Sequence, residues 1–327
     1  MTPLEPAARE SERSAPGPDG DGGGLPGPRR GLPTEAPGGV DLDNLLRAAL
    51  DEDLGAGDLT SRMAVPAGAR ASARLVAKEA GVLAGLGCFA RVFELCDAGI
   101  VFETSRQDGD TVAPGDQLAR LEGDAHALLA GERTALNLLQ RLCGIATRTA
   151  SFVKLAEAAA GERQVRILDT RKTTPGLRVL EKYAVRCGGG ENHRIGLFDE
   201  VMLKENHIDL AGRPIGEVLA DLRTAVGDGV RITAEARDGR EAQEAVRGGA
   251  DVVLLDNMTP AQMAALAPEL RSLGQARGRE LELEASGGIG AGDLEAVAAS
   301  GVDRISIGAL THSVSALDLS LYLEPVR

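Results

Sequence analysis

Six short apolar segments alternate with stretches rich in alanine and leucine over the C-terminal half of this 327-residue chain. This alternation constrains the fold more than any other feature of the sequence. The segments expected to be strands cover residues 165–169, 200–204, 230–235, 251–256, 281–286 and 302–308. The stretches expected to be helices include 213–226, 238–248, 259–273 and 291–300. Near-continuous apolar strands that alternate with helices are typical of a parallel sheet covered on both faces, so the pattern predicts an α/β fold.

The number of strands narrows the choice of architecture. Six strands are few for a complete eight-fold barrel, so a smaller or incomplete (β/α) barrel is favoured. An open doubly wound sheet remains the alternative, but no predicted strand is followed by the G-x-G-x-x-G pattern of dinucleotide-binding sheets.

The N-terminal part of the chain differs from the rest in composition. Residues 1–39 hold eight of the fifteen prolines and nine glycines, with almost no large apolar side chains. Such a segment cannot bury enough surface to offset the entropy lost on ordering, so we predict a disordered tail. Its composition is neither that of a signal peptide nor that of a transit peptide. Residues 40–150 are predicted to form a small α+β domain with an antiparallel sheet, beginning with a helix capped by Asp41 or Asp43. Residues 151–327 are assigned to the barrel domain, and the last of them could return to the N-terminal domain.

Charge and cysteine content exclude several classes of partner. The net charge of −13 argues against binding to nucleic acids or to anionic membranes, which are bound by basic surfaces. No run of about 18 apolar residues could span a bilayer. The four cysteines are widely spaced and form no metal-binding pair, which indicates buried thiols in a reducing cytoplasm.

Polar or glycine-rich residues follow every predicted strand of the C-terminal half. In barrels of parallel strands, the C-terminal ends of the strands carry the active site. A cationic group suited to a ligand with more than one carboxylate comes from the first two strand ends and from the glycine-rich segment between them. This group consists of Arg171, Lys172, His193, Arg194 and Lys204.

The other strand ends predict two further kinds of binding. Glu235 and Asp256 end neighbouring strands and offer the oxygen ligands that a divalent cation such as Mg²⁺ prefers. The glycine-rich turns at Ser286-Gly287-Gly288 and Gly308 each precede a predicted helix, which is typical of a phosphate site. The rim as a whole therefore predicts a phosphorylated ligand, a divalent cation and a small polycarboxylate side by side.

The motifs that carry these residues resemble one known family. They are GERTALNLLQRLCGIAT, LDTRKTTPGLRVLEKYAVRCGGGENHR, VMLKENHI, VVLLDNM, EASGGI and DRISIGALTHS. Over residues 41–327 the chain resembles quinolinate phosphoribosyltransferase, also called nicotinate-nucleotide pyrophosphorylase (carboxylating). The D-T-R-K-T-T-P-G and G-G-G-x-x-N-H-R segments are the most specific of these motifs.

The resemblance implies a reaction and an assembly. Quinolinate and 5-phosphoribosyl 1-pyrophosphate (PRPP) would give nicotinate mononucleotide, pyrophosphate and CO₂ with Mg²⁺, in de novo NAD biosynthesis. It implies an N-terminal open-faced α/β sandwich and a C-terminal incomplete barrel of about six or seven strands. It also implies a homodimer, or a higher assembly of dimers, in which the N-terminal domain of one subunit covers the barrel mouth of its partner, and we expect this assembly in the cytoplasm that the cysteines indicate.

Residue roles follow from the resemblance, motif by motif. Arg133 would reach the substrate of the neighbouring subunit, although its pattern alone is that of a solvated surface arginine. Arg171, His193 and Arg194 would hold the two quinolinate carboxylates. Lys172 and Lys204 would contact quinolinate and PRPP, and would act with Glu235 and Asp256 in catalysis. The last two would meet the ribose hydroxyls and Mg²⁺, and the 5′-phosphate would bind at Ser286, Gly287, Gly288 and Gly308.

Three alternative functions stay open at this point. One is a related pyrophosphorylase, of the type found beside molybdate-transport systems, that acts on another base. Another is a barrel lyase that uses Lys204 as a Schiff base. The third is a protein that binds PRPP without turning it over. The sequence leaves the role of His312 undetermined.

Overall fold

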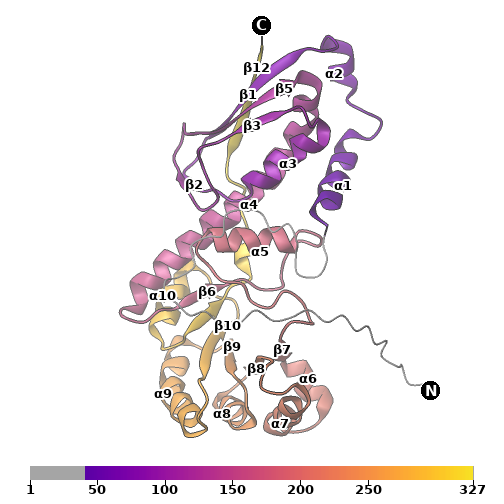
Figure 1. Ribbon diagram of the computed structural model, residues 1–327. Coiled ribbons are helices and arrows are strands. Elements are labelled where there is room, and N and C mark those ends of the chain that lie inside the picture. The colour runs from indigo at the N-terminus through magenta and orange to yellow at the C-terminus, as the bar shows by residue number, and fades with distance from the viewer. Residues whose placement is uncertain (1–40, 327) are drawn as a thin grey trace, which may run out of the picture.

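The computed structural model describes residues 41–326. The tail predicted over residues 1–39 lies outside the described residues. Two sheets organise the described chain, a small antiparallel sheet near both termini of this range and a larger parallel sheet between (Figure 1).

The first helices and the small sheet form the N-terminal unit. Helix α1 (Leu42–Leu54) begins at Asp41, whose side chain accepts hydrogen bonds from the backbone of Asp43 and Asn44, and helix α2 (Leu59–Ala64) is capped in the same way by Asp58. The four-stranded sheet has the order β12-β1-β5-β3, and a separate pair joins β2 to β4. The bounds are β1 Arg70–Ala77, β2 Gly81–Val82, β3 Val101–Glu103, β4 Thr111–Val112, β5 Gln117–Asp124 and β12 Leu319–Pro325.

One face of the small sheet is buried and the other is partly exposed. Along β1, every second side chain is buried, from Ala71 to Ala77, which is the alternation expected of a sheet packed on one side only. Helix α3 (Leu86–Cys96) packs with the long helix α4 (Ala125–Ala160). The sequence patterns had not identified α3, because its apolar residues Leu86, Phe89, Val92 and Phe93 lie between two short strands.

Helix α4 connects the two units without a linker. It contains 36 residues and runs through the domain boundary that the sequence placed between residues 150 and 151. The chain also returns to the small sheet at its end, where β12 pairs antiparallel with β1. The two units therefore share a helix and a terminal strand.

The C-terminal half forms an incomplete barrel, which confirms the predicted fold class. Its six parallel strands lie in the order β6-β11-β10-β9-β8-β7 and are open between β6 and β7. The strands are β6 Arg166–Leu168, β7 Val201–Leu203, β8 Ile232–Ala236, β9 Val252–Asp256, β10 Glu282–Ser286 and β11 Arg304–Ser306. The helices are α5 Arg178–Cys187, α6 Glu205–Ala211, α7 Ile215–Val226, α8 Gly239–Gly248, α9 Pro260–Ala276, α10 Ala291–Ala299 and α11 Ala309–His312.

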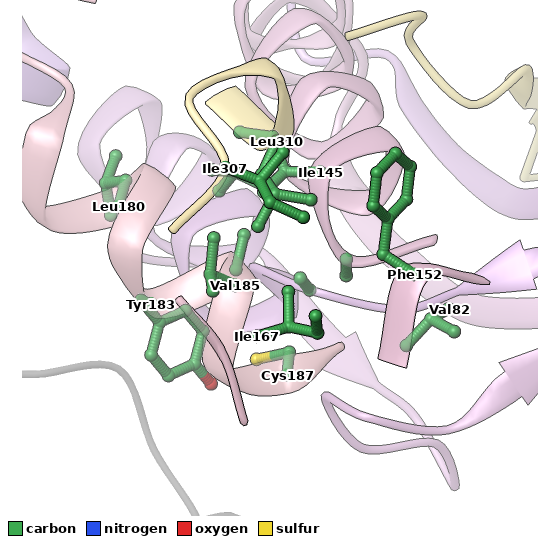
Figure 2. Packing of buried hydrophobic residues seen from close by; sticks show 14 of the residues in the cluster. Val82, Ile145, Phe152, Ile167, Leu180, Tyr183, Val185, Cys187, Ile307 and Leu310 are labelled. Carbon is green, nitrogen blue, oxygen red and sulfur yellow. The ribbon is translucent and has the colours of Figure 1, made fainter. Parts of the chain in front are cut away.

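The core continues from one unit into the other. Figure 2 shows Ile145 of α4 close to Ile307 and Leu310, which follow β11, with Ile167 of β6 and Val185 of α5 nearby. The open edge of β6 is approached by the segment before His193, where Glu191 forms a parallel bridge to Leu168. The segment between α5 and β7 thus occupies the position where a closed barrel would continue.

Among residues 41–326, no helix is both long enough and apolar enough to cross a membrane.

Candidate active site

The C-terminal ends of the barrel strands surround one cavity of about 800 Å³. Eleven of the twelve site residues predicted from the sequence line it, which brings the cationic and anionic groups together as expected. These are Arg171, Lys172, His193, Arg194, Lys204, Glu235, Asp256, Ser286, Gly287, Gly288 and Gly308. The twelfth, Arg133, lies exposed on α4 and does not line this cavity.

The cationic side of the cavity has exposed charges available to a ligand. Arg171 and Lys172 follow β6 and are exposed, and within residues 41–326 no carboxylate forms an ion pair with either. Arg194 is mostly buried, and its guanidinium donates to the carbonyl oxygen of Glu200 at 3.2 Å. Burial and, after it, the charge of Arg171 lower the pKa of Arg194. An anion bound between these two arginines would relieve their repulsion.

The imidazole of His193 is held by the protein on both sides. Its Nδ1 accepts a hydrogen bond from the backbone N–H of Arg194 at 2.8 Å, so Nε2 carries the proton of the neutral ring. That Nε2 lies 3.3 Å from Glu284 Oε1, and Arg304 Nε lies 2.8 Å from Glu284 Oε2. Neither contact meets hydrogen-bond geometry, so each is a close polar contact with the buried carboxylate of Glu284. Burial is the largest single effect on Glu284 and by itself would raise its pKa. His193 and, after it, Arg304 together lower the pKa by more, so the net pKa lies below its usual value.

Glu284 was not among the residues predicted from the sequence, although a signal for it exists. Strand β10 reads Glu-Leu-Glu-Ala-Ser, and alternate side chains of a strand point to the same face. The assignment of Ser286 to the site therefore implied that Glu284 faces the same side. It is fully buried and lines the cavity.

The anionic side is formed by adjacent strands, as predicted. Lys204 Nζ lies 2.7 Å from Glu235 Oε2, and the backbone N–H of Lys204 donates to His207 Nδ1 at 2.9 Å. Burial and, after it, the charge of Glu235 raise the pKa of Asp256. A cation placed between the two carboxylates would oppose this shift.

Asn257 is a further residue that sequence patterns did not single out. Its Nδ2 donates to Asp256 Oδ2 at 2.6 Å, which orients that carboxylate. Its φ of 53° lies in the left-handed region, and it is the one non-glycine residue of the described chain with a positive φ. Asparagine tolerates this conformation better than most residues, and such positions cluster at functional sites.

The donor set fits a hard divalent cation in part. Glu235 and Asp256 provide carboxylate oxygens, which such a cation prefers. Within residues 41–326, no group of three or more His, Cys, Asp or Glu side chains is arranged to hold a metal. The pair would therefore need oxygen atoms from a ligand or from water to complete a coordination shell.

The glycine-rich turn after β10 has no room for a side chain at Gly287. Gly287 has a φ of 101°, and a Cβ there would lie 2.8 Å from the backbone nitrogen of Asn257. Helix α10 follows this turn and has no side-chain cap, so its first N–H groups are available to an anion. At the turn after the neighbouring strand β11, a Cβ at Gly308 would lie 2.8 Å from Lys172 Cδ. The backbone can therefore approach a phosphate closely at both turns.

Comparison with known proteins identifies relatives for nearly the whole described chain. Residues 58–143 match the family described as quinolinate phosphoribosyl transferase, N-terminal domain, and residues 145–322 match its C-terminal domain. A protein of Bacillus subtilis called a probable nicotinate-nucleotide pyrophosphorylase [carboxylating] is 43% identical over 282 residues, covering 86% of this chain and 93% of the relative. The chloroplastic nicotinate-nucleotide pyrophosphorylase [carboxylating] of Arabidopsis thaliana is 37% identical over 295 residues, covering 87% and 83%.

Solved structures agree with these relatives. The crystal structure of NadC from Streptococcus pyogenes superposes with a TM-score of 0.78 at 38% identity, covering 88% of this chain and 97% of that one. The nicotinate-nucleotide pyrophosphorylase of Francisella tularensis gives a TM-score of 0.77 at 35% identity, covering 86% and 96%.

Proposed function

The chain belongs to the quinolinate phosphoribosyl transferase family, and from this premise we infer that it is a carboxylating nicotinate-nucleotide pyrophosphorylase. It converts quinolinate and PRPP to nicotinate mononucleotide, pyrophosphate and CO₂. The observation that carries this conclusion is the match of both family domains, with the predicted cationic, anionic and glycine-rich residues around one cavity.

A direct assay tests the function. The purified protein is incubated with quinolinate, PRPP and Mg²⁺, and nicotinate mononucleotide and CO₂ are followed together. We expect both products in equal amounts and neither without quinolinate. Turnover of PRPP with another pyridine base, without CO₂ release, would instead assign the chain to the related pyrophosphorylases that use a different base.

The cationic side suits the two carboxylates of quinolinate. Arg171 offers a planar guanidinium without an ion-pair partner in residues 41–326, and the neighbouring charge of Arg194 favours an anion between them. Lys172 and His193 complete this side of the cavity. Two carboxylates held at fixed points would orient the pyridine ring, so that its nitrogen faces the ribose.

Arg171→Ala is expected to raise the KM for quinolinate by about 10–100-fold, because a hydrogen bond to a charged group contributes about 1.5–3 kcal/mol. The KM for PRPP should change much less. Steady-state kinetics with each substrate varied in turn measures the difference. Arg240→Ala, which removes a highly exposed arginine on α8, is the control for loss of charge. An unchanged KM for quinolinate would remove Arg171 from the base site.

The glycine-rich turns and the two carboxylates suit PRPP. The 5′-phosphate would lie against Ser286, Gly287, Gly288 and Gly308, and the ribose hydroxyls near Glu235 and Asp256. Mg²⁺ bound with PRPP oxygens at Glu235 and Asp256 would supply positive charge that stabilises the departing pyrophosphate.

Gly287→Ala is expected to raise the KM for PRPP about tenfold or more and to destabilise the fold by about 1–3 kcal/mol, because a left-handed backbone would be strained and the new Cβ would approach the backbone of Asn257. Urea unfolding and PRPP titrations measure the two effects. Gly278→Ala is the control, since Gly278 also has a left-handed backbone (φ 65°), has open space for a Cβ and does not line the cavity. Equal behaviour of the two variants would contradict a close phosphate turn at Gly287.

The reaction needs positioning more than a protein nucleophile. The quinolinate nitrogen forms a bond to C1 of the ribose while the bond from C1 to the pyrophosphate oxygen breaks. The bond from C2 of the ring to its carboxylate then breaks, CO₂ leaves, and the electron pair on C2 takes a proton. Alignment of two bound reactants can contribute about 7–11 kcal/mol to such a step. Lys204, paired with Glu235 and also half-exposed to the cavity, would stabilise charge on the leaving group.

The pairing of Lys204 also argues against a Schiff-base lyase. A Schiff-base lysine needs its amine free to attack a carbonyl, whereas Lys204 Nζ is held by Glu235 Oε2 at 2.7 Å. Borohydride in the presence of carbonyl compounds should therefore leave activity unchanged. Stable attachment of a carbonyl compound to Lys204 would reverse this assignment.

A second subunit would account for the position of Arg133 outside the cavity. Leu59 and Met63 of α2 are 73% and 88% exposed, and Leu197 and Phe198, close to Arg194, are 72% and 69% exposed. Exposed apolar side chains of this size in groups mark protein interfaces. We therefore propose a homodimer in which α2 and α4 of one subunit cover the barrel mouth of the other, with Arg133 entering the partner's cavity.

A cytoplasmic location fits the thiol chemistry. All four cysteines are free, and burial raises the pKa of Cys88, Cys143 and Cys187 to about 12. Such thiols are protonated and unreactive at neutral pH.

A further inference from the structure

A buried ion pair lies behind the cationic side of the cavity and is absent from the roles described so far. Lys182 of α5 is 1% exposed, and Asp169, directly after β6, is fully buried. Lys182 Nζ forms an ion pair with Asp169 Oδ1. Neither residue lines the cavity. The pair can therefore affect the cavity only through residues that it contacts and that lie next to the cavity.

What the pair touches is the backbone of His193. Lys182 Nζ donates to the carbonyl oxygen of His193 at 2.8 Å, and Asp169 Oδ1 accepts from its N–H at 2.9 Å. Both backbone polar groups of this residue are thus held by one ion pair. Asp169 Oδ2 also accepts from the side-chain amide of Asn192. His193 is therefore held at two points and Asn192 at a third.

This segment has no strand on one side to hold it. It lies at the opening between β6 and β7, where its one ladder contact is the bridge between Leu168 and Glu191. The charges of Arg194 and Arg171 repel each other while no anion lies between them. A fixed anchor behind the segment would keep His193 and Arg194 at the cavity before the substrate binds.

Stability alone does not explain the pair. Burial, the largest effect on each group, raises the pKa of Asp169 and lowers the pKa of Lys182. Desolvation of both charges offsets much of their attraction, and apolar residues of similar size often serve stability as well or better. Fixing a geometry is the best-supported reason to retain such a pair.

We propose that Lys182 and Asp169 are positioning residues that hold His193 and Arg194 in the geometry required by the dicarboxylate base. This inference rests on the proposed function, because it assumes that His193 and Arg194 face quinolinate. It assigns no contact between the pair and the substrate. It predicts that loss of the pair affects binding of the base and not of PRPP, whose groups lie on other strands.

Lys182→Met keeps the length of the side chain and removes the charge and the donor. We expect the KM for quinolinate to rise about 10–100-fold, as for a displacement of about 1 Å at a reacting site. The affinity for PRPP, measured by calorimetry without quinolinate, should stay within about twofold of the unchanged protein, because the phosphate turns are not displaced. Lys182→Arg, which keeps the charge, should recover part of the lost quinolinate affinity.

The control removes an ion pair of another part of the barrel. Arg223 of α7 pairs with Asp251, at the start of β9 and away from the cavity. Arg223→Met should lower the Tm and leave both KM values unchanged. Asp169→Asn provides a second test, because its amide oxygen can still accept from His193 while the ion pair is lost.

The outcomes separate the two proposals. If the unsubstituted protein does not release CO₂ from quinolinate, the proposed function fails. If it does, but Lys182→Met and Asp169→Asn leave the KM for quinolinate unchanged or raise both KM values equally, the positioning role is wrong. Failure of both variants to fold, with Arg223→Met folded, would assign the pair to stability and also overturn the proposal.

Discussion

Lys204→Ala is expected to lower kcat/KM for PRPP by about 10²–10³-fold, the loss typical of removing one preorganised group that stabilises developing charge. The ammonium lies 2.7 Å from Glu235, beside the half-buried Asp256 on the next strand. Its removal leaves two carboxylates without their nearest cation, at the place where pyrophosphate must depart. The loss should therefore appear in kcat as well as in KM. Initial rates over a range of PRPP concentrations measure both.

Lys154→Ala is the matched control, because it removes the same charge from an exposed position on α4. It should behave as the unsubstituted protein does. Thermal unfolding of both variants separates a lost fold from a lost charge. If Lys204→Ala retains more than about a tenth of the original kcat/KM, Lys204 has no major role in the chemical step.

Mixing two inactive variants is expected to restore activity. Arg133→Ala removes the group that we propose to enter the partner's cavity, and Lys204→Ala removes a group of the chain's own cavity. In a heterodimer, one cavity loses both groups and the other regains both. Random mixing in equal amounts forms heterodimers as half of all dimers, so about a quarter of the original activity should return. Subunit exchange followed by the quinolinate assay measures the recovery.

Purified heterodimers, isolated through two different affinity tags, give the sharper result. Each heterodimer has one intact cavity out of two, so we expect about half of the original activity. Either parent variant alone should have almost none. The same procedure with two differently tagged copies of Arg133→Ala is the control. Heterodimers as inactive as their parents would show that Arg133 serves no neighbouring cavity.

Much of the barrel could be predicted from local sequence. The six apolar segments all form strands, and β7 to β11 lie side by side in chain order, as parallel connections through helices favour. Because parallel strands end at the same edge, the residues after each strand were expected to meet. The cavity confirms this convergence for Arg171 and Asp256, which are 85 positions apart in the sequence.

The buried charges that sequence patterns missed share a physical cause. Helix α5 contains Glu181 and Lys182, which read as surface charges by composition, yet both are buried in the structure. Glu181 accepts from Arg141 and from the backbone of Thr174, and Lys182 pairs with Asp169. Burial of a charge depends on partners that lie far away in the sequence, so no local pattern could predict it. The same reason hid Glu284, which is compensated by His193 and Arg304.

By itself, the sequence determined the six strands of the barrel and the chemical groups that stand at their ends, because both depend on neighbours within a few residues. Tertiary structure alone decided that α4 crosses from one unit to the other, that β12 closes the small sheet, and that Asp169 and Lys182 hold His193 from behind. These features depend on contacts between residues far apart in the chain. Their free energies arise from packing and desolvation in the folded molecule, and only the complete fold specifies which groups meet.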